Sequence, residues 1–298
     1  MSRSSSIAAS ASSFSKVRDV LALFKLRLSA LVVFSAGLGF MMGSPIGNVD
    51  AWGLLLLVIA GTLVTGASNA FNQVVEADTD ALMQRTSDRP MVRRRLKVWE
   101  AVALAGLAGG SGVYMLWAVF GPLTAILGLL SLFMYVALYT PLKRHSAWSV
   151  FVGAFPGAFP PMLGYVAATG QFGLGPGLLF AMQFMWQFPH FWAIAWVLND
   201  DYNKAGLRML PSRGGRDGQS AFLILLYTLF VIPTGMLPWV FGLTGIWSMI
   251  AAVAAGALML WPSFRLLFRQ DVASARQLMF ASFVYLPVVQ IAYVLDRT

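Results

Sequence analysis

The chain has 298 residues, of which 58% are hydrophobic and only 11% charged. Soluble domains carry about 45–50% apolar and about 25% charged residues, so this composition indicates a membrane protein. The formal net charge of +9 is spread too thinly for a nucleic-acid-binding domain, and we expect no nucleic-acid partner. The lack of Cys excludes disulfides and thiolate metal sites, and two His residues are too few for a histidine-rich metal centre.

The N-terminal segment, residues 1–19, precedes the first apolar stretch. Its first 15 residues are rich in Ser and carry no acidic side chain, and no apolar core of a signal peptide comes before Val20. A transit peptide is one interpretation, but the segment is short, which favours a disordered cytoplasmic tail. Residues 20–298 are then expected to form one transmembrane domain.

Long apolar stretches follow along the rest of the chain. A spanning helix needs about 20 mostly apolar residues, because about 30 Å of hydrocarbon is crossed at about 1.5 Å per residue. Continuous apolar runs such as 54–60 do not alternate with polar residues, so they argue against a transmembrane β-barrel. We predict an all-α, polytopic bundle of nine transmembrane helices, at residues 28–45, 51–75, 98–119, 122–141, 147–169, 176–198, 220–241, 244–264 and 276–295.

The basic residues predict the orientation of this bundle in the lipid bilayer. Of the 21 Lys and Arg residues, all but Arg297 lie before the first span, in residues 1–27, or in the loops after the even-numbered spans. By the positive-inside rule the N-terminus and the even-numbered loops are cytoplasmic, and the C-terminus lies on the opposite face. Because the tail is short for a cleaved presequence, a bacterial plasma membrane is favoured over the mitochondrial inner membrane.

The first polar cluster follows the second span. Asn72, Glu76 and Asp80 are spaced four residues apart and share one helical face, with Asn69 and Gln73 alongside, whereas Asp78 points elsewhere. Carboxylate and amide oxygens followed by arginines suit Mg²⁺ and a substrate phosphate, because Mg²⁺ shares its ligands between carboxylates and phosphates. The alternative is a network of salt bridges at the membrane interface that only fixes topology.

The sixth span and its loop hold the second group of polar residues. His190 lies within an aromatic run, where a lone histidine is usually a hydrogen-bonded structural residue. Asp200, Asp201, Lys204 and Arg208 repeat the order of acid followed by base. Asp200 and Lys204 alone would form an ordinary ion pair over one helical turn. Two such clusters on the same membrane face favour a joint site.

These segments resemble a known family, the UbiA-type intramembrane prenyltransferases. The run from Asn72 to Pro90 is similar to the family's first aspartate-rich motif, and four later segments match the subfamily that farnesylates protohaem: residues 139–144, 153–164, 186–192 and 201–211. Two departures stand out. Glu76 replaces the usual Asp, and Asp200 and Asp201 lack a second acid four residues later, so a symmetric two-metal site is not expected.

The resemblance implies transfer of a farnesyl group from farnesyl diphosphate to the vinyl group of haem b, with addition of water, to give haem O. It implies Mg²⁺ as the cofactor and a haem A synthase as the partner that receives the product. It also implies roles for named side chains: Mg²⁺ binding by Asn72, Glu76, Asp80 and Asp200; diphosphate binding by Arg85, Arg89, Lys143 and Arg144; and substrate contacts by Asp78, Tyr139, His190, Asp200, Asp201, Tyr202, Lys204 and Arg208.

Among the substrate contacts, His190 is expected to face haem, and axial ligation of the iron is one role open to it. Lys204 and Arg208 are expected to bind either diphosphate or haem propionates. Three other functions remain open at this point. A prenyltransferase of the same fold acting on a quinone precursor is the nearest. An ion-coupled transporter would need acids near the bilayer midplane, whereas these lie at one face. A structural assembly factor gives no reason for the acid and arginine arrangement.

Overall fold

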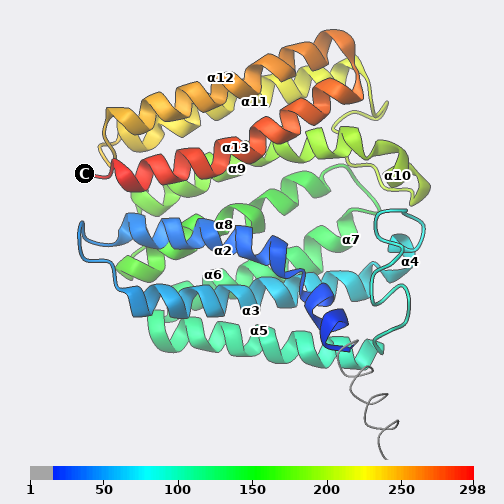
Figure 1. Ribbon diagram of the computed structural model, residues 1–298, viewed down its shortest axis with the longest axis horizontal. Coiled ribbons are helices and arrows are strands. Elements are labelled where there is room, and N and C mark those ends of the chain that lie inside the picture. Colours follow the sequence, from blue (N-terminus) through cyan, green and yellow to red (C-terminus); the bar gives the residue numbers. More distant parts are fainter. Residues whose placement is uncertain (1–15) are drawn as a thin grey trace, which may run out of the picture.

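The structure is a computed structural model that describes residues 16–298, and within them it is a helical bundle without strands (Figure 1). Its named elements are α2 (Leu26–Gly43), α3 (Ala51–Val75), α4 (Ala77–Asp80), α5 (Val98–Phe120), α6 (Pro122–Phe133), the π-helix η1 (Met134–Tyr139), α7 (Thr140–Leu142), α8 (Ser149–Thr169), α9 (Leu174–Val197), α10 (Asn199–Lys204), α11 (Gly218–Val240), α12 (Ile246–Arg269) and α13 (Val272–Leu295). The predicted all-α class is confirmed.

Eight of the described helices, with α6, η1 and α7 taken together as one, are long and apolar enough to cross a membrane. The remaining long helix, α9, has 24 residues but contains Gln183, Gln187 and His190, which lower its hydropathy. All three of these side chains are buried against other helices, as polar groups at membrane depth must be. The count of nine spans is therefore not confirmed, although α9 is at least as long as α8, α11 and α13, against which it packs.

The outer surface of the bundle is apolar. Large side chains such as Leu107, Trp247 and Leu258 are exposed on it. A water-soluble protein rarely exposes so much apolar area, whereas lipid solvates it well. Inside, α9 packs against α8, α11 and α13, while α8 packs against α2, and α3 against α5. The short elements α4, α7 and α10 gather at one end of the bundle, opposite the C-terminus (Figure 1).

Helix α8 contains Pro156, Pro160 and Pro161, and the sequence predicts a kink or an unwound turn there. The structure shows no unwound turn, because the helix runs without interruption from Ser149 to Thr169. A proline leaves the carbonyl four residues before it without a helical partner. Gln183 Nε2 donates to the Gly157 carbonyl at 2.7 Å, and Ser131 Oγ donates to the Pro156 carbonyl at 3.4 Å. Neighbouring helices thus replace the hydrogen bonds that the prolines remove.

The N-terminal tail differs from the expectation where the structure describes it. Residues 1–15, most of the expected disordered tail, lie outside the described residues, and residues 16–24 are helical. Asp19 is buried, and its Oδ1 accepts a hydrogen bond from Arg95 Nε at 2.9 Å. Leu23 is fully buried as well. This ion pair and this apolar contact fix the segment against the loop before α5.

Glycines set the distance between α2 and α8. A Cβ added to Gly39 would collide with the backbone of Pro161, and a Cβ added to Gly164 would collide with the carbonyl of Ala36. Transmembrane helices approach this closely only where small residues face each other.

We therefore expect Gly164→Ala to lower stability by about 1–3 kcal/mol, because the added methyl group overpacks a backbone contact. The matched control is Gly110→Ala on α5, where a Cβ meets open space and the substitution favours the helix. Thermal unfolding in detergent measures the difference. Equal midpoints for the two variants would show that the two helices separate freely.

Candidate active site

The first polar cluster forms where α3 ends. Glu76 leaves α-helical geometry at φ −97°, ψ 6°, and α4 follows at once. The backbone hydrogen bonds continue across this change, from Glu76 N to Asn72 O at 2.9 Å and from Asp80 N to Glu76 O at 2.8 Å. Asn72, Glu76 and Asp80 therefore share one buried face, as their spacing predicts. Asp78 is exposed, in agreement with the prediction that it points elsewhere.

Both buried acids are matched by a cation. Glu76 Oε1 lies 2.5 Å from Lys143 Nζ, and Glu76 Oε2 accepts a hydrogen bond from Asn72 Nδ2 at 2.9 Å. Asp80 Oδ2 pairs with Arg89. Asp80 Oδ1 is buried and has no hydrogen-bond partner among the described residues. The site thus brings together Glu76, Asp80, Arg89 and Lys143, with one carboxylate oxygen left to bind something else.

The end of the fourth span forms the opposite wall. Asn72 Nδ2 also donates to Thr140 Oγ1 at 3.1 Å, which ties α3 to α7. Lys143 Nζ lies 4.7 Å from the ring centroid of Tyr139, a cation–π distance. Arg144 is exposed and donates to the Val75 carbonyl at 3.0 Å. Lys143 is therefore inside the site, whereas Arg144 caps the end of α3 from outside.

The second polar cluster joins the first through one of its two acids. Asp201 accepts hydrogen bonds from the backbone N–H of Gln84 at 2.9 Å and of Arg85 at 3.3 Å. Burial raises the pKa of the Asp201 carboxyl, but these hydrogen bonds outweigh it and hold the pKa below its usual value. Lys204 lies 3.5 Å from the same carboxylate. The two clusters are therefore neighbours, as the repeated order of acid and base indicated.

Asp200 is oriented differently. Its side chain is 78% exposed and pairs with Arg216 at 3.0 Å, while Arg216 also donates to the carbonyls of Trp196 and Val197. This arrangement gives Asp200 no metal-binding contact. Arg85 and Arg208 are also exposed, and neither forms an ion pair within residues 16–298. Tyr202 is half-buried and packs against the core beside α9.

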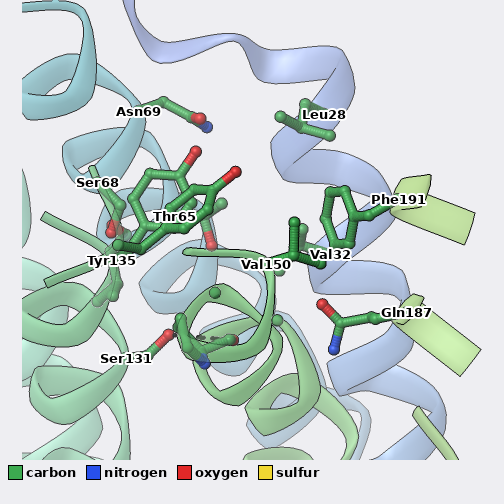
Figure 2. Close-up of a pocket in the computed structure, with 15 residues that line it drawn as sticks. Leu28, Val32, Thr65, Ser68, Asn69, Ser131, Tyr135, Val150, Gln187 and Phe191 are labelled. Atoms are coloured by element: carbon green, nitrogen blue, oxygen red, sulfur yellow. Dashed lines mark hydrogen bonds between the residues drawn. The ribbon is translucent and has the colours of Figure 1, made fainter. Parts of the chain in front are cut away.

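A cavity of about 200 Å³ lies among the helices (Figure 2), and two of its lining residues, Asn69 and Tyr139, are one helical turn along the chain from Asn72 and Lys143. Thr65, Ser68 and Asn69 of α3 line one wall together with Tyr135, while Val32 of α2 and Phe191 of α9 face them across the space. Tyr139, the other tyrosine of η1, also lines the cavity, and its ring centroid lies 5.2 Å from that of Tyr135. A π-helical turn inside a longer helix often marks a functional site. The cavity is therefore largely apolar with aromatic walls, and its polar side chains come from α3, α6, η1 and α9.

His190 faces α13, whereas its neighbours Gln187 and Phe191 line the cavity. Its ring stacks on Trp186 at 4.4 Å between centroids, and Nδ1 lies 2.8 Å from Ser282 Oγ. Because Ser282 donates its only hydroxyl proton to the Met279 carbonyl, Nδ1 must carry the hydrogen and donate to Ser282. Nε2 then keeps its lone pair. A haem-facing role for His190 stays a prediction.

The oxygen donors suit Mg²⁺. Asn72, Glu76 and Asp80 lie on one face, and the unpartnered Asp80 Oδ1 is available as a ligand. Within the described part of the chain, no three Asp, Glu or His side chains come close enough together to hold a metal by themselves. A magnesium ion here would need substrate phosphate oxygens to complete the set of ligands that the protein begins.

The structure also places residues at the site that the motifs did not single out. Thr140 joins α7 to Asn72, and Lys25 lies among the charges of Glu76, Asp80, Arg89 and Lys143. The sequence indicates only a role in membrane orientation for Lys25, because a lysine just before a span is ordinary under the positive-inside rule. Its position in a run of five residues, FKLRL, gave no signal of chemistry.

Comparison with known proteins extends these findings. Residues 31–285 match the UbiA prenyltransferase family. The protoheme IX farnesyltransferase of Cytophaga hutchinsonii is 47% identical over 92% of this chain and 96% of its own length. The enzyme of the same name from Christiangramia forsetii is 45% identical over 96% of this chain and 95% of its own length.

Solved structures of low sequence identity share the fold. A digeranylgeranylglyceryl phosphate synthase superposes with a TM-score of 0.79 at 16% identity, covering 95% of this chain and 98% of its own. A UbiA homologue from Archaeoglobus fulgidus, bound to GPP and Mg²⁺, gives a TM-score of 0.66 at 14% identity over 93% and 99% of the two chains. With the family match over most of its length, this chain belongs to the UbiA prenyltransferase family.

Proposed function

We propose that the protein transfers the farnesyl group of farnesyl diphosphate to the vinyl group of haem b, with addition of water, to form haem O. The observation that carries the proposal is the buried face of Asn72, Glu76 and Asp80, matched by Arg89 and Lys143. Asn72 and Lys143 lie one helical turn along the chain from Asn69 and Tyr139, which line the cavity. The protoheme IX farnesyltransferases to which the chain is similar support haem b as the acceptor.

The polar end of the site would bind the diphosphate. Arg89 and Lys143 supply the cationic groups, and both already lie within ion-pair distance of the acids. Asn72, Glu76 and Asp80 would hold Mg²⁺, which when bound offsets the negative charge that grows on a departing diphosphate. The apolar cavity takes the isoprenoid chain.

The reaction divides into bond breaking and addition. The C1–O bond of farnesyl diphosphate breaks, and its electron pair leaves with the diphosphate. The vinyl π electrons of haem b then form the new carbon–carbon bond to the allylic cation, after which water adds to the resulting porphyrin-side cation and loses a proton. The Tyr135 and Tyr139 rings border the cavity and stabilise positive charge through their π faces.

The location and partners follow the same reasoning. The apolar surface and the family indicate an integral membrane protein. We propose the inner membrane of a bacterium, with the end that carries α4, α7 and α10 in the cytoplasm, because the basic residues concentrate there. Haem b is then the acceptor, and a haem A synthase the partner that takes the product.

The proposed function predicts a product. Purified protein with haem b, farnesyl diphosphate and Mg²⁺ should yield haem O, detected by mass spectrometry, and chelation of Mg²⁺ with EDTA should stop the reaction. A parallel incubation with 4-hydroxybenzoate tests the quinone alternative. A prenylated benzoate without any haem O would contradict the proposal and support the quinone alternative.

Asp80 should be essential to turnover. We expect Asp80→Asn to lower kcat by about 10²-fold or more, because the change removes a carboxylate charge where the metal and diphosphate bind. The control is Asp271→Asn at the start of α13, since Asn caps a helix as well as Asp does. Full Mg²⁺-dependent activity in a folded Asp80→Asn protein would remove this residue from the site.

His190 should affect haem and not the prenyl donor. If Nε2 binds the haem iron, His190→Ala weakens haem binding in an absorbance titration and shifts the Soret band, while the KM for farnesyl diphosphate stays the same. His145→Ala is the matched control, because His145 is the other histidine and lies exposed in a loop. Unchanged haem affinity in His190→Ala would leave this histidine a structural role.

A further inference from the structure

Lys25 occupies an unusual backbone position beside the site. It separates the helical segment 16–24 from α2, and its φ of 47° and ψ of 54° are left-handed. Glycine and asparagine are the residues that adopt this conformation most easily, whereas a long side chain pays a steric penalty. The turn itself therefore gives no reason for a lysine at this position.

The helix that carries the acids also holds this break in place. Gln73 Nε2 of α3 donates to the carbonyls of Ala22 at 3.2 Å and Leu23 at 2.8 Å, which precede Lys25. Asn69 Nδ2, one turn earlier on α3, donates to Ser29 Oγ at 3.4 Å just after it. Gln73 therefore holds the main chain before Lys25, and Asn69 holds the Ser29 side chain after it. The lysine is positioned relative to Asn72 and Glu76 by the same helix.

The Lys25 ammonium group lacks a partner of its own. It is half-buried, and within residues 16–298 it forms neither an ion pair nor a side-chain hydrogen bond. The charges that face it are Glu76 at the end of α3, Asp80 of α4, Arg89 of the following loop and Lys143 after α7. Because Arg89 and Lys143 already neutralise Asp80 and Glu76, Lys25 is the surplus cation of the cluster.

We propose that Lys25 is a third diphosphate-binding cation, which acts with Arg89 and Lys143 when the prenyl donor enters. This inference rests on the part of the proposed function that concerns binding of the prenyl diphosphate, and not on the identity of the acceptor. Leu28, one helical turn after Lys25, lines the cavity, so a chain lying in the cavity leaves its diphosphate near the lysine. Lys25 has no carboxylate partner of its own, and a multiply charged phosphate group would supply the negative charge that balances it.

The protonation of Lys25 gives the proposal a measurable consequence. Burial, together with the charges of Arg89 and Lys143, lowers the pKa of Lys25 to about 7. Below pH 7 the free protein already carries the charged lysine. Above pH 7 the neutral amine must take up one proton to bind the anion, so affinity falls by up to tenfold per pH unit until the higher pKa of the complex is reached.

The experiment measures binding of farnesyl thiolodiphosphate, an analogue that resists ionisation, with Mg²⁺ by calorimetry in detergent between pH 6.5 and 8.5. Lys25→Arg keeps the charge at every pH, so its affinity should fall less steeply than that of the unmodified protein. Ionisation of the analogue affects both proteins alike, and the difference in slope isolates Lys25. Two buffers of different ionisation enthalpy should show about one proton taken up at pH 8 by the unmodified protein only.

Lys25→Gly separates the charge from the turn, because glycine adopts the left-handed conformation without strain. We expect its affinity to fall by tenfold or more at pH 6.5 with no loss of thermal stability. Arg27→Met, two residues along on an exposed side chain, is the control and should bind as the unmodified protein does. Equal affinity for Lys25→Gly and the unmodified protein would overturn the proposal.

If Lys25→Gly fails to fold, Lys25→Gln decides instead, because glutamine removes the charge and keeps a long side chain. Equal affinity for Lys25→Gln and the unmodified protein would exclude Lys25. The outcome is also independent of the acceptor. Binding of the analogue that depends on Lys25, in a protein that forms no haem O, leaves this inference standing and removes the proposed acceptor. Haem O formation, together with unchanged binding of the analogue in the Lys25 variants that lack the charge, would overturn this inference and leave the proposed acceptor standing.

Discussion

The site depends on the neutralisation of two carboxylates buried at the end of α3. Glu76 and Asp80 would be strongly destabilising in isolation, since leaving one buried charge unpaired costs about 3–5 kcal/mol. Lys143 and Arg89 remove that cost, and they come from the end of the fourth span and from the loop after α4. The two ion pairs therefore join segments that hydrophobic packing alone would leave free to slide. Under the proposed function, a substrate phosphate and its metal would compete for the same four groups.

Within the bundle, buried polar side chains join helices through hydrogen bonds, as the two ion pairs join segments at the site. Ser35 of α2 donates to Gln183 Oε1 at 2.8 Å, and Gln290 of α13 donates to both of them. The remaining amide of Gln183 satisfies the Gly157 carbonyl released by Pro161. This closed set of hydrogen bonds keeps α8 and α9 in register, because no water is available in hydrocarbon to replace a broken bond. The cavity wall built from these helices is correspondingly well defined.

Much of this arrangement could be predicted, and the failures have a common cause. Apolar length located the helices, and a four-residue period placed Asn72, Glu76 and Asp80 on one face, because both signals are local. Asp200 and Asp201 are chemically identical neighbours, and tertiary contacts alone distinguish them. Arg216 holds the first at the surface, and the amides of Gln84 and Arg85 bind the second. Lys25 was missed for the same reason, since its conformation and neighbours depend on residues far along the chain.

The glycines of α8 show how one pattern serves two purposes. Gly153 and Gly157 form a small-x3-small pair, for which close packing of helix backbones is the usual role. A Cβ at Gly153 would instead meet the Tyr139 ring, and one at Gly157 would meet the Gln187 amide. Both of these side chains line the cavity, so the glycines make room for its lining groups. The backbone contact between helices is made elsewhere on α8, at Gly164. A methyl group at Gly153 would displace the Tyr139 ring that Lys143 covers, whereas one at Gly157 would displace the Gln187 amide, so each glycine preserves a different part of the cavity lining.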